Sequence, residues 1–107
     1  MDEKIKKWLF DIQNSIFEIE NYFQPGEKSY FTFQNNTMLK RAVERDLEII
    51  GEAINKILKE NPSIEITSAQ KIVGLRNQII HSYDTISDEN IWGITVNHLP
   101  KLKIEVE

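Results

Sequence analysis

The 107-residue chain contains no cysteine, which excludes a disulfide framework and any zinc site built from thiolates. It has no apolar run long enough to cross a bilayer, and its charged N-terminus, MDEKIKKWLFDIQ, does not resemble a signal peptide. Neither strand-like alternation, nor a repeat, nor a low-complexity segment is present. We therefore expect one helical domain over residues 1–107, cytoplasmic and without a membrane segment.

Positive charge is also in short supply, because the formal net charge is -4. A general nucleic-acid binder is normally basic, since neutralising phosphates provides most of its affinity. Any contact with RNA must therefore be local, or must depend on a site assembled between chains.

Apolar residues recur at three- and four-residue steps in four segments, which predicts an all-α fold. The short connections favour an up-and-down antiparallel bundle of four main helices. We predict these helices over about 2–23, from Asn36 or Thr37 to near Asn61, from Thr67 or Ser68 to about Tyr83, and from Ser87 to near Pro100. Asn36, Thr37 and Ser87 are good N-caps.

Two further features have ordinary structural explanations. The segment EKSYFTFQNN reads as a loop whose aromatics, Tyr30, Phe31 and Phe33, close the end of the bundle. The row of Glu44, Glu48 and Glu52 could suggest a metal, but nearby Arg and Lys residues make a solvated, mixed-charge helix face the better interpretation.

Asp46 falls inside the apolar stripe of the second helix, between Val43 and Ile50. A buried carboxylate without a partner is costly, so Arg76 or His81 could pair with it. Alternatively, a small rotation of the helix would let Asp46 reach solvent. Both interpretations remain open from the residues alone.

The segment RNQIIHSY, residues 76–83, lies on the third predicted helix. On a helical projection Ile72, Leu75 and Ile79 form the core face, while Val73 and Ile80 form a second apolar line. A helix with two apolar sides is seldom left with one of them in water. We therefore predict a symmetric homodimer with this helix at or near the interface.

The polar residues of the same segment suit RNA cleavage by an attacking 2'-hydroxyl. His81 can move a proton near neutral pH, and Arg76 can neutralise charge that develops on phosphorus. Asn77 lies one helical turn before His81 and could hold the imidazole in one orientation. We expect no metal or other cofactor. By residue type alone, a lone histidine on a helix is more often structural than catalytic.

The spacing Arg-x4-His-x-Tyr, with Asn directly after Arg, resembles the signature of the HEPN superfamily, and specifically of the HepT-like toxins. The segments ERDLEIIGEAINKI, KIVGLRNQIIHSY and DENIW agree with it, and the resemblance covers nearly the whole chain. Many relatives carry a Pro-Trp pair before the third helix, where this chain reads TSAQKI. That departure concerns local packing, not the motif.

The resemblance implies a dimeric helical bundle in which Arg76 and His81 of both chains share a cleft and cleave RNA without metal. Asn77 would support them, and we add Asp46 as a second supporting residue. The resemblance also implies a toxin–antitoxin pair in which an MntA-like nucleotidyltransferase antitoxin adds AMP to Tyr83. The alternative is a non-catalytic helical binding module that partners a minimal nucleotidyltransferase.

Overall fold

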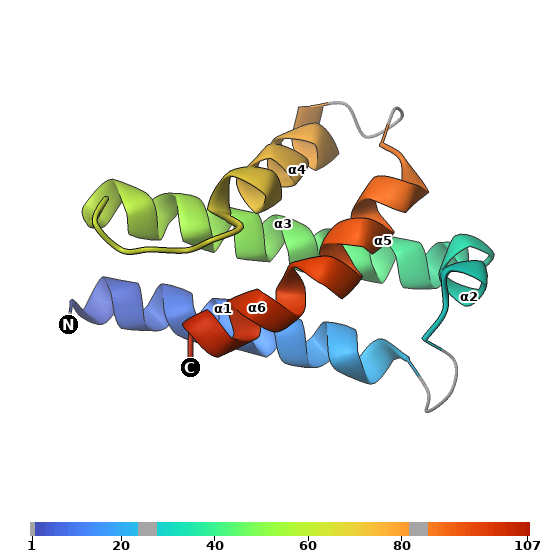
Figure 1. The fold of residues 1–107 in the computed structure, drawn as a ribbon, viewed down its shortest axis with the longest axis horizontal. Coiled ribbons are helices and arrows are strands. Elements are labelled where there is room, and N and C mark those ends of the chain that lie inside the picture. The colour runs from blue at the N-terminus through green and yellow to red at the C-terminus, as the bar shows by residue number, and fades with distance from the viewer. Residues whose placement is uncertain (1, 24–27, 82–85) are drawn as a thin grey trace.

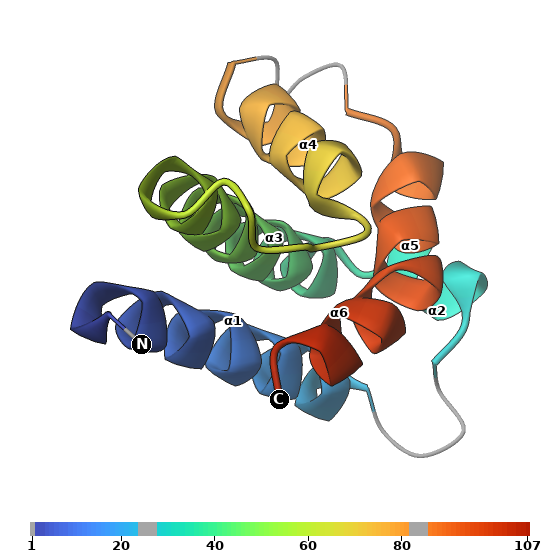
Figure 2. The same ribbon diagram turned by 60° about the vertical axis from the view of Figure 1, so that its left-hand side comes forward.

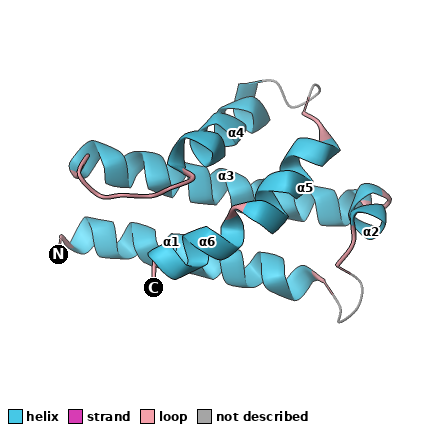
Figure 3. Ribbon diagram, viewed as in Figure 1, coloured by secondary structure: helices cyan, strands magenta, loops and turns pink. Residues whose placement is uncertain are grey.

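The chain's regular structure is helical throughout the part that the computed structural model describes, residues 2–23, 28–81 and 86–107 (Figure 3). The helices in order are α1 (Glu3–Tyr22), α2 (Tyr30–Gln34), α3 (Thr37–Glu60), α4 (Ala69–His81), α5 (Asp88–Asn97) and α6 (Leu99–Glu105). The predicted all-α class is confirmed. No described helix is both long enough and apolar enough to span a bilayer.

The long helix α3 is the centre of the arrangement, because it packs against both α1 and α4 (Figure 1). It runs antiparallel to α1, as an up-and-down bundle requires. Turning the molecule shows α5 and α6 crossing the remaining side, where α5 contacts α4 and α6 contacts α1 (Figure 2). The motif helix α4 is therefore held between α3 and α5.

One hydrophobic core joins these helices. In α1, Ile5, Ile12, Ile16 and Ile19 are buried at three-, four- and seven-residue steps, so they form one apolar stripe. The matching stripe of α3 is Leu39, Val43, Leu47, Ile50, Ala53, Ile54 and Ile57. Burial of these two stripes against each other sets the packing of α1 on α3.

Side-chain caps place the helix starts where the sequence predicted them. The Oδ1 atom of Asn36 accepts a hydrogen bond from the backbone N–H of Leu39 at 3.0 Å, at the start of α3. Likewise, Oγ of Ser87 accepts from the N–H of Asn90 at 3.1 Å, at the start of α5. Each cap satisfies a donor that the first helical turn leaves without a partner.

Two short helices were not predicted. The helix α2 lies inside the segment expected to be a loop, and five residues are too few to show a helical period. The helix α6 begins just where Pro100 was expected to end the fourth helix. Proline fits the first turn of a helix, where its missing N–H needs no partner, so it starts α6 here.

The aromatic residues of α2 close the end of the bundle in part. Phe33 is fully buried, with its ring centre 5.4 Å from that of Trp92, and Tyr30 lies 6.2 Å from the same ring. Phe31 instead is 75% exposed. The expected plug is thus formed by Tyr30 and Phe33, and the expectation is wrong for Phe31.

The glutamate row of α3 is less solvated than expected. Glu44 is only 8% exposed, and both of its carboxylate oxygens accept from Nη1 of Arg41, at 3.1 and 2.8 Å. Oε1 of Glu48 lies 3.4 Å from Nη1 of Arg45, and the side chain of Glu48 remains partly exposed. The interpretation as a mixed-charge face holds for the pairing of charges, but it is wrong for the exposure of Glu44.

Candidate functional site

The helix α4 carries the motif and ends at His81. Ile72 and Leu75 are buried, and Ile79 is partly buried, so the predicted core face is confirmed. Val73 is half-buried and Ile80 is 39% exposed on the second apolar line. Tyr83, the expected modification site, lies outside the described residues.

Arg76 points toward α3, where its Nη2 forms an ion pair with Oε2 of Glu52. Its Nη1 also donates a hydrogen bond to Oδ1 of Asn77 at 2.9 Å. The Nε–H is buried and has no acceptor among the described residues. A carboxylate and an amide therefore hold the guanidinium in place without using all of its donors.

Gly51 determines how closely the arginine approaches α3. A Cβ atom added at Gly51 would lie 2.5 Å from Cβ of Arg76, 3.0 Å from its Cγ and 3.2 Å from the carbonyl oxygen of Ile72. Real Cβ contacts are essentially never shorter than 3.0 Å. Only glycine lets α4 cross α3 at this distance, and the crossing brings Arg76 beside Glu52.

The guanidinium lies at a cleft of about 350 Å³ that α1, α3 and α4 line. Its charged residues are the cations Lys7, Arg45, Lys56 and Arg76 and the carboxylates Asp11, Glu48 and Glu52. The cleft thus has one positive charge in excess, although the whole chain has a net charge of -4. No group of three or more carboxylate or histidine side chains able to hold a metal ion occurs in the described ranges.

His81 is exposed at the C-terminal end of α4, five residues beyond Arg76. Five helical residues correspond to about 7.5 Å along the axis and about 140° around it. The two side chains therefore leave α4 on different faces. The hydrogen bonds among the described residues include one from Arg76 to Asn77 but none between Asn77 and His81.

The expected partner of Asp46 was wrong. Asp46 is only 2% exposed, so of the two open interpretations the buried one is confirmed and the solvent-exposed one is wrong. Its partner is the hydroxyl of Tyr22 in α1, from which it accepts a short hydrogen bond of 2.5 Å. Burial raises the pKa of Asp46 to about 6, with nearby Glu18 contributing in the same direction and Tyr22 opposing. Asp46 faces away from Arg76 and His81 because its side of α3 packs against α1.

Sequence reasoning missed both Glu52 and Gly51 as parts of this site. The two residues lie side by side in the segment IIGEA, where the spacing of Glu52 predicts only a solvated, mixed-charge helix face. A glycine in the middle of a predicted helix, directly before an acidic residue, was the available signal.

Comparisons with known proteins agree on one family. The family model described as Ribonuclease HepT-like matches residues 12–107. The Methanocaldococcus jannaschii protein named "Putative RNase MJ1380" is 38% identical over 96% of this chain and 94% of its own length. A second protein of that organism, "Putative RNase MJ0125", is 34% identical over 96% and 88%, respectively. "Putative RNase TTE0752" of Caldanaerobacter subterraneus subsp. tengcongensis is 32% identical over 74% and 71%. No solved structure matches the chain significantly.

Proposed function

Because the chain belongs to the HepT-like ribonuclease family, we propose that it is an endoribonuclease that cleaves RNA without metal through Arg76 and His81. The observation that carries the proposal is the position of Arg76. Its guanidinium lies in a cleft with an excess of positive charge, in a chain that is acidic overall. Such a cleft attracts an RNA phosphate locally, where the chain as a whole would not.

In the proposed reaction the 2'-hydroxyl of one nucleotide attacks the adjacent phosphorus. The P–O5' bond breaks, leaving a 2',3'-cyclic phosphate and a free 5'-hydroxyl. His81 takes the proton of the attacking hydroxyl, and a second imidazole or water supplies one to the leaving oxygen. Arg76 stabilises the negative charge on the non-bridging oxygens as the phosphorane forms.

We propose further that two copies of the chain complete the site. Arg76 and His81 leave α4 about 140° apart, so one helix does not direct both at the same phosphate. A two-fold axis beside α4 would place His81 of one chain near Arg76 of its partner. The half-buried Val73 and the 39% exposed Ile80 supply an apolar line for that contact.

The RNase is proposed to be the toxin of a toxin–antitoxin pair. Its antitoxin would be an MntA-like nucleotidyltransferase that adds AMP to Tyr83, two residues after His81. The support is the resemblance of the motif, including its tyrosine. An added AMP would carry a phosphate close to the site and compete with RNA for the cations there.

The test is cleavage of single-stranded RNA in the presence of EDTA. Arg76→Ala and His81→Ala should each lose cleavage by about a hundredfold or more while remaining folded and dimeric. Asn77→Ala should lose less, because its amide only orients a neighbour. Full activity of either of the first two variants, or a dependence on added metal, would contradict the proposal.

Tyr83→Phe separates regulation from chemistry. The phenol is not needed for the cleavage step, so this variant should cleave RNA nearly as well as the parent. It should no longer be inactivated by the nucleotidyltransferase and ATP, because the acceptor oxygen is gone. If Tyr83→Phe is as inactive as His81→Ala, the tyrosine belongs to the catalytic machinery.

The alternative is a non-catalytic helical module that partners a minimal nucleotidyltransferase, and the net charge of -4 favours it. Growth on expression distinguishes the two. If expression of the parent protein arrests growth and His81→Ala relieves that arrest, the ribonuclease is supported. If cells that express the parent and cells that express His81→Ala grow equally well, the binding module is supported.

A further inference from the structure

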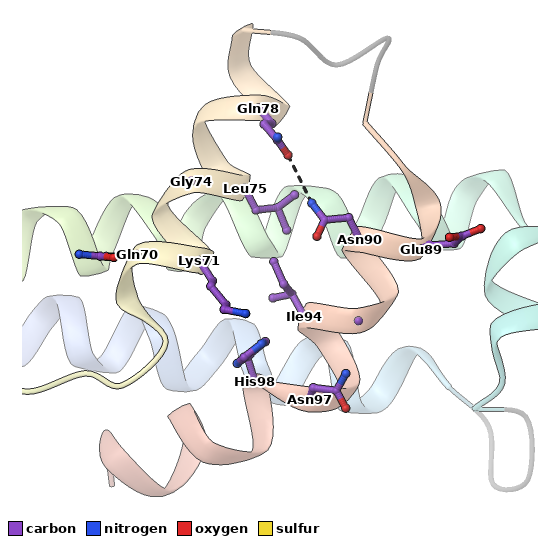
Figure 4. Close-up of a pocket in the computed structure, with 11 residues that line it drawn as sticks. Gln70, Lys71, Gly74, Leu75, Gln78, Glu89, Asn90, Ile94, Asn97 and His98 are labelled. Atoms are coloured by element: carbon purple, nitrogen blue, oxygen red, sulfur yellow. Dashed lines mark hydrogen bonds between the residues drawn. The ribbon is translucent and has the colours of Figure 1, made fainter.

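A second groove lies on the other side of α4, between this helix and α5 (Figure 4). Its volume is about 410 Å³, within the size range of small-ligand sites. Leu75 and Ile94 lie between the two helices and form its apolar floor. Lys71 and His98 stand at one end, and the amides of Gln78 and Asn90 meet at the other.

The two glycines that line this groove, Gly74 and Gly93, are not required by close contacts with any other described residue. Among the residues that the structure describes, a Cβ added at Gly74 or Gly93 would meet no neighbouring atom within 4 Å. By contrast, Gly51 is required by its contact with Arg76. Glycine within a helix costs about 0.5–1 kcal/mol relative to alanine. Two such glycines on one groove indicate that a molecule outside the chain approaches the helix backbones there.

The chemistry of the lining indicates what that molecule is. The amides of Gln78, Asn90 and Asn97 offer both donors and acceptors, and the Asn90–Gln78 hydrogen bond is long, at 3.4 Å. Burial, followed by the charges of nearby lysines, lowers the pKa of His98, which disfavours a positive charge on its ring. Lys71 and Glu89 cancel in charge. A flat group with polar edges and apolar faces fits this lining, as a nucleobase does.

The groove also leads to the proposed catalytic residue. Gly74 and His81 are seven residues apart, which places them within about 20° of each other around α4 and about 10 Å apart along it. That distance corresponds to about three stacked nucleotides at ~3.4 Å each. A strand with its scissile phosphate at His81 would therefore lay its neighbouring bases along the groove.

We propose that the α4–α5 groove binds the bases of the single-stranded RNA segment next to the cleavage site. This rests on the proposed function, because the ligand is that enzyme's substrate. The scissile phosphate would be held where His81 meets Arg76 of a second copy of the chain, and bases would be read along the Gly74 side of α4; this separation of phosphate and base contacts is usual in nucleic-acid recognition. A second copy of the chain fits less well here, since the apolar line of Val73 and Ile80 lies about 100–120° away around the helix.

The test uses RNA that cannot be cleaved, with every 2'-hydroxyl methylated, and measures binding to the full chain by fluorescence anisotropy. Gly74→Leu and Gly93→Leu would fill the groove and should weaken binding at least tenfold. Gly74→Ala and Gly93→Ala are matched controls, because alanine and leucine have similar helix propensities. The alanine variants should bind within twofold of the parent.

A second pair of variants guards against misfolding of the leucine variants. Gln78→Glu and Asn90→Asp replace exposed amides with carboxylates, and both should weaken binding and change the preference among homopolymers of A, C, G and U. Unchanged affinity in all four groove variants would overturn the proposal. So would failure of the parent to bind the methylated RNA. A change in sedimentation with unchanged RNA affinity would instead assign the groove to a second copy of the chain.

Cleavage assays separate this proposal from the proposed function. If the parent binds methylated RNA through the groove but does not cleave ordinary RNA, the proposal for the groove is supported and the proposal of a ribonuclease is contradicted. If the parent cleaves RNA and the groove variants bind and cleave RNA as the parent does, the proposal of a ribonuclease is supported and the proposal for the groove is contradicted.

Discussion

Gly51→Ala is the most informative single change in this protein, because the structure gives its consequence directly. The added Cβ would lie 2.5 Å from Cβ of Arg76 and 3.2 Å from the carbonyl oxygen of Ile72. Neither atom is the free end of a flexible side chain, so α4 itself must move away from α3. Such overpacking costs about 1–3 kcal/mol, and this contact belongs at the upper end of that range.

Part of the loss is offset, since alanine stabilises a helix by about 1 kcal/mol relative to glycine. We therefore expect Gly51→Ala to lower the free energy of unfolding by about 1–2 kcal/mol. Gly74→Ala is the matched control, because an added Cβ there meets no neighbouring atom of the described residues within 4 Å. It should raise the free energy of unfolding by about 0.5–1 kcal/mol.

The free energies of unfolding of the two variants should thus differ by about 1.5–3 kcal/mol, measured by urea unfolding at one fixed protein concentration. In a chain of this size the corresponding separation in Tm is about 10–20 °C. RNA cleavage by Gly51→Ala should fall as well, since the movement of α4 would displace Arg76 from its position in the cleft. A Gly51→Ala protein that unfolds at the parent's urea concentration and cleaves normally would refute the close-crossing explanation.

Three further predictions concern the packing and the charges of the helical bundle. The pKa of Asp46 is about 6 in the folded chain, against an ordinary value of 3.8. Its contribution to stability therefore falls as pH rises from about 4 to 6 and is lowest above 6. Asp46→Asn should therefore be more stable than the parent by about 2–3 kcal/mol at pH 7.5 but not at pH 4, as measured by urea unfolding. An equal difference in stability at both pH values would contradict the raised pKa of Asp46. Glu52→Gln removes the charge that competes with phosphate for the arginine, so methylated RNA should bind a few-fold tighter, corresponding to about 1 kcal/mol or less. Glu60→Gln, farther along α3, should leave that affinity unchanged, and a similar gain in both would show a general charge effect. Phe33→Ala should lose about 3–5 kcal/mol because the ring is fully buried, whereas Phe31→Ala, at a 75% exposed position, should change stability by no more than about 0.5 kcal/mol. Comparable losses in both would contradict the observed packing of α2.

The sequence by itself determined the class of fold, the main helices and the motif. The stripes of α1 and α3 follow from spacing along one helix, and the starts of α3 and α5 follow from caps that bond three residues ahead. Such signals lie within a few residues of each other, so they can be read before any tertiary contact forms. The position of Arg76 and His81 on one helix was readable for the same reason.

Tertiary structure alone decided which residues meet. The sequence left open whether Asp46 is buried or reaches solvent, and the rotation of α3 buried it with Tyr22 of α1 as its partner instead of a residue of α4. Glu52 became the partner of Arg76 because Gly51 allows α4 to cross α3 at close distance. Pairings of this kind depend on the rotation and crossing of two helices distant in the chain, and helical periodicity places a residue on a face without specifying which neighbour that face will contact.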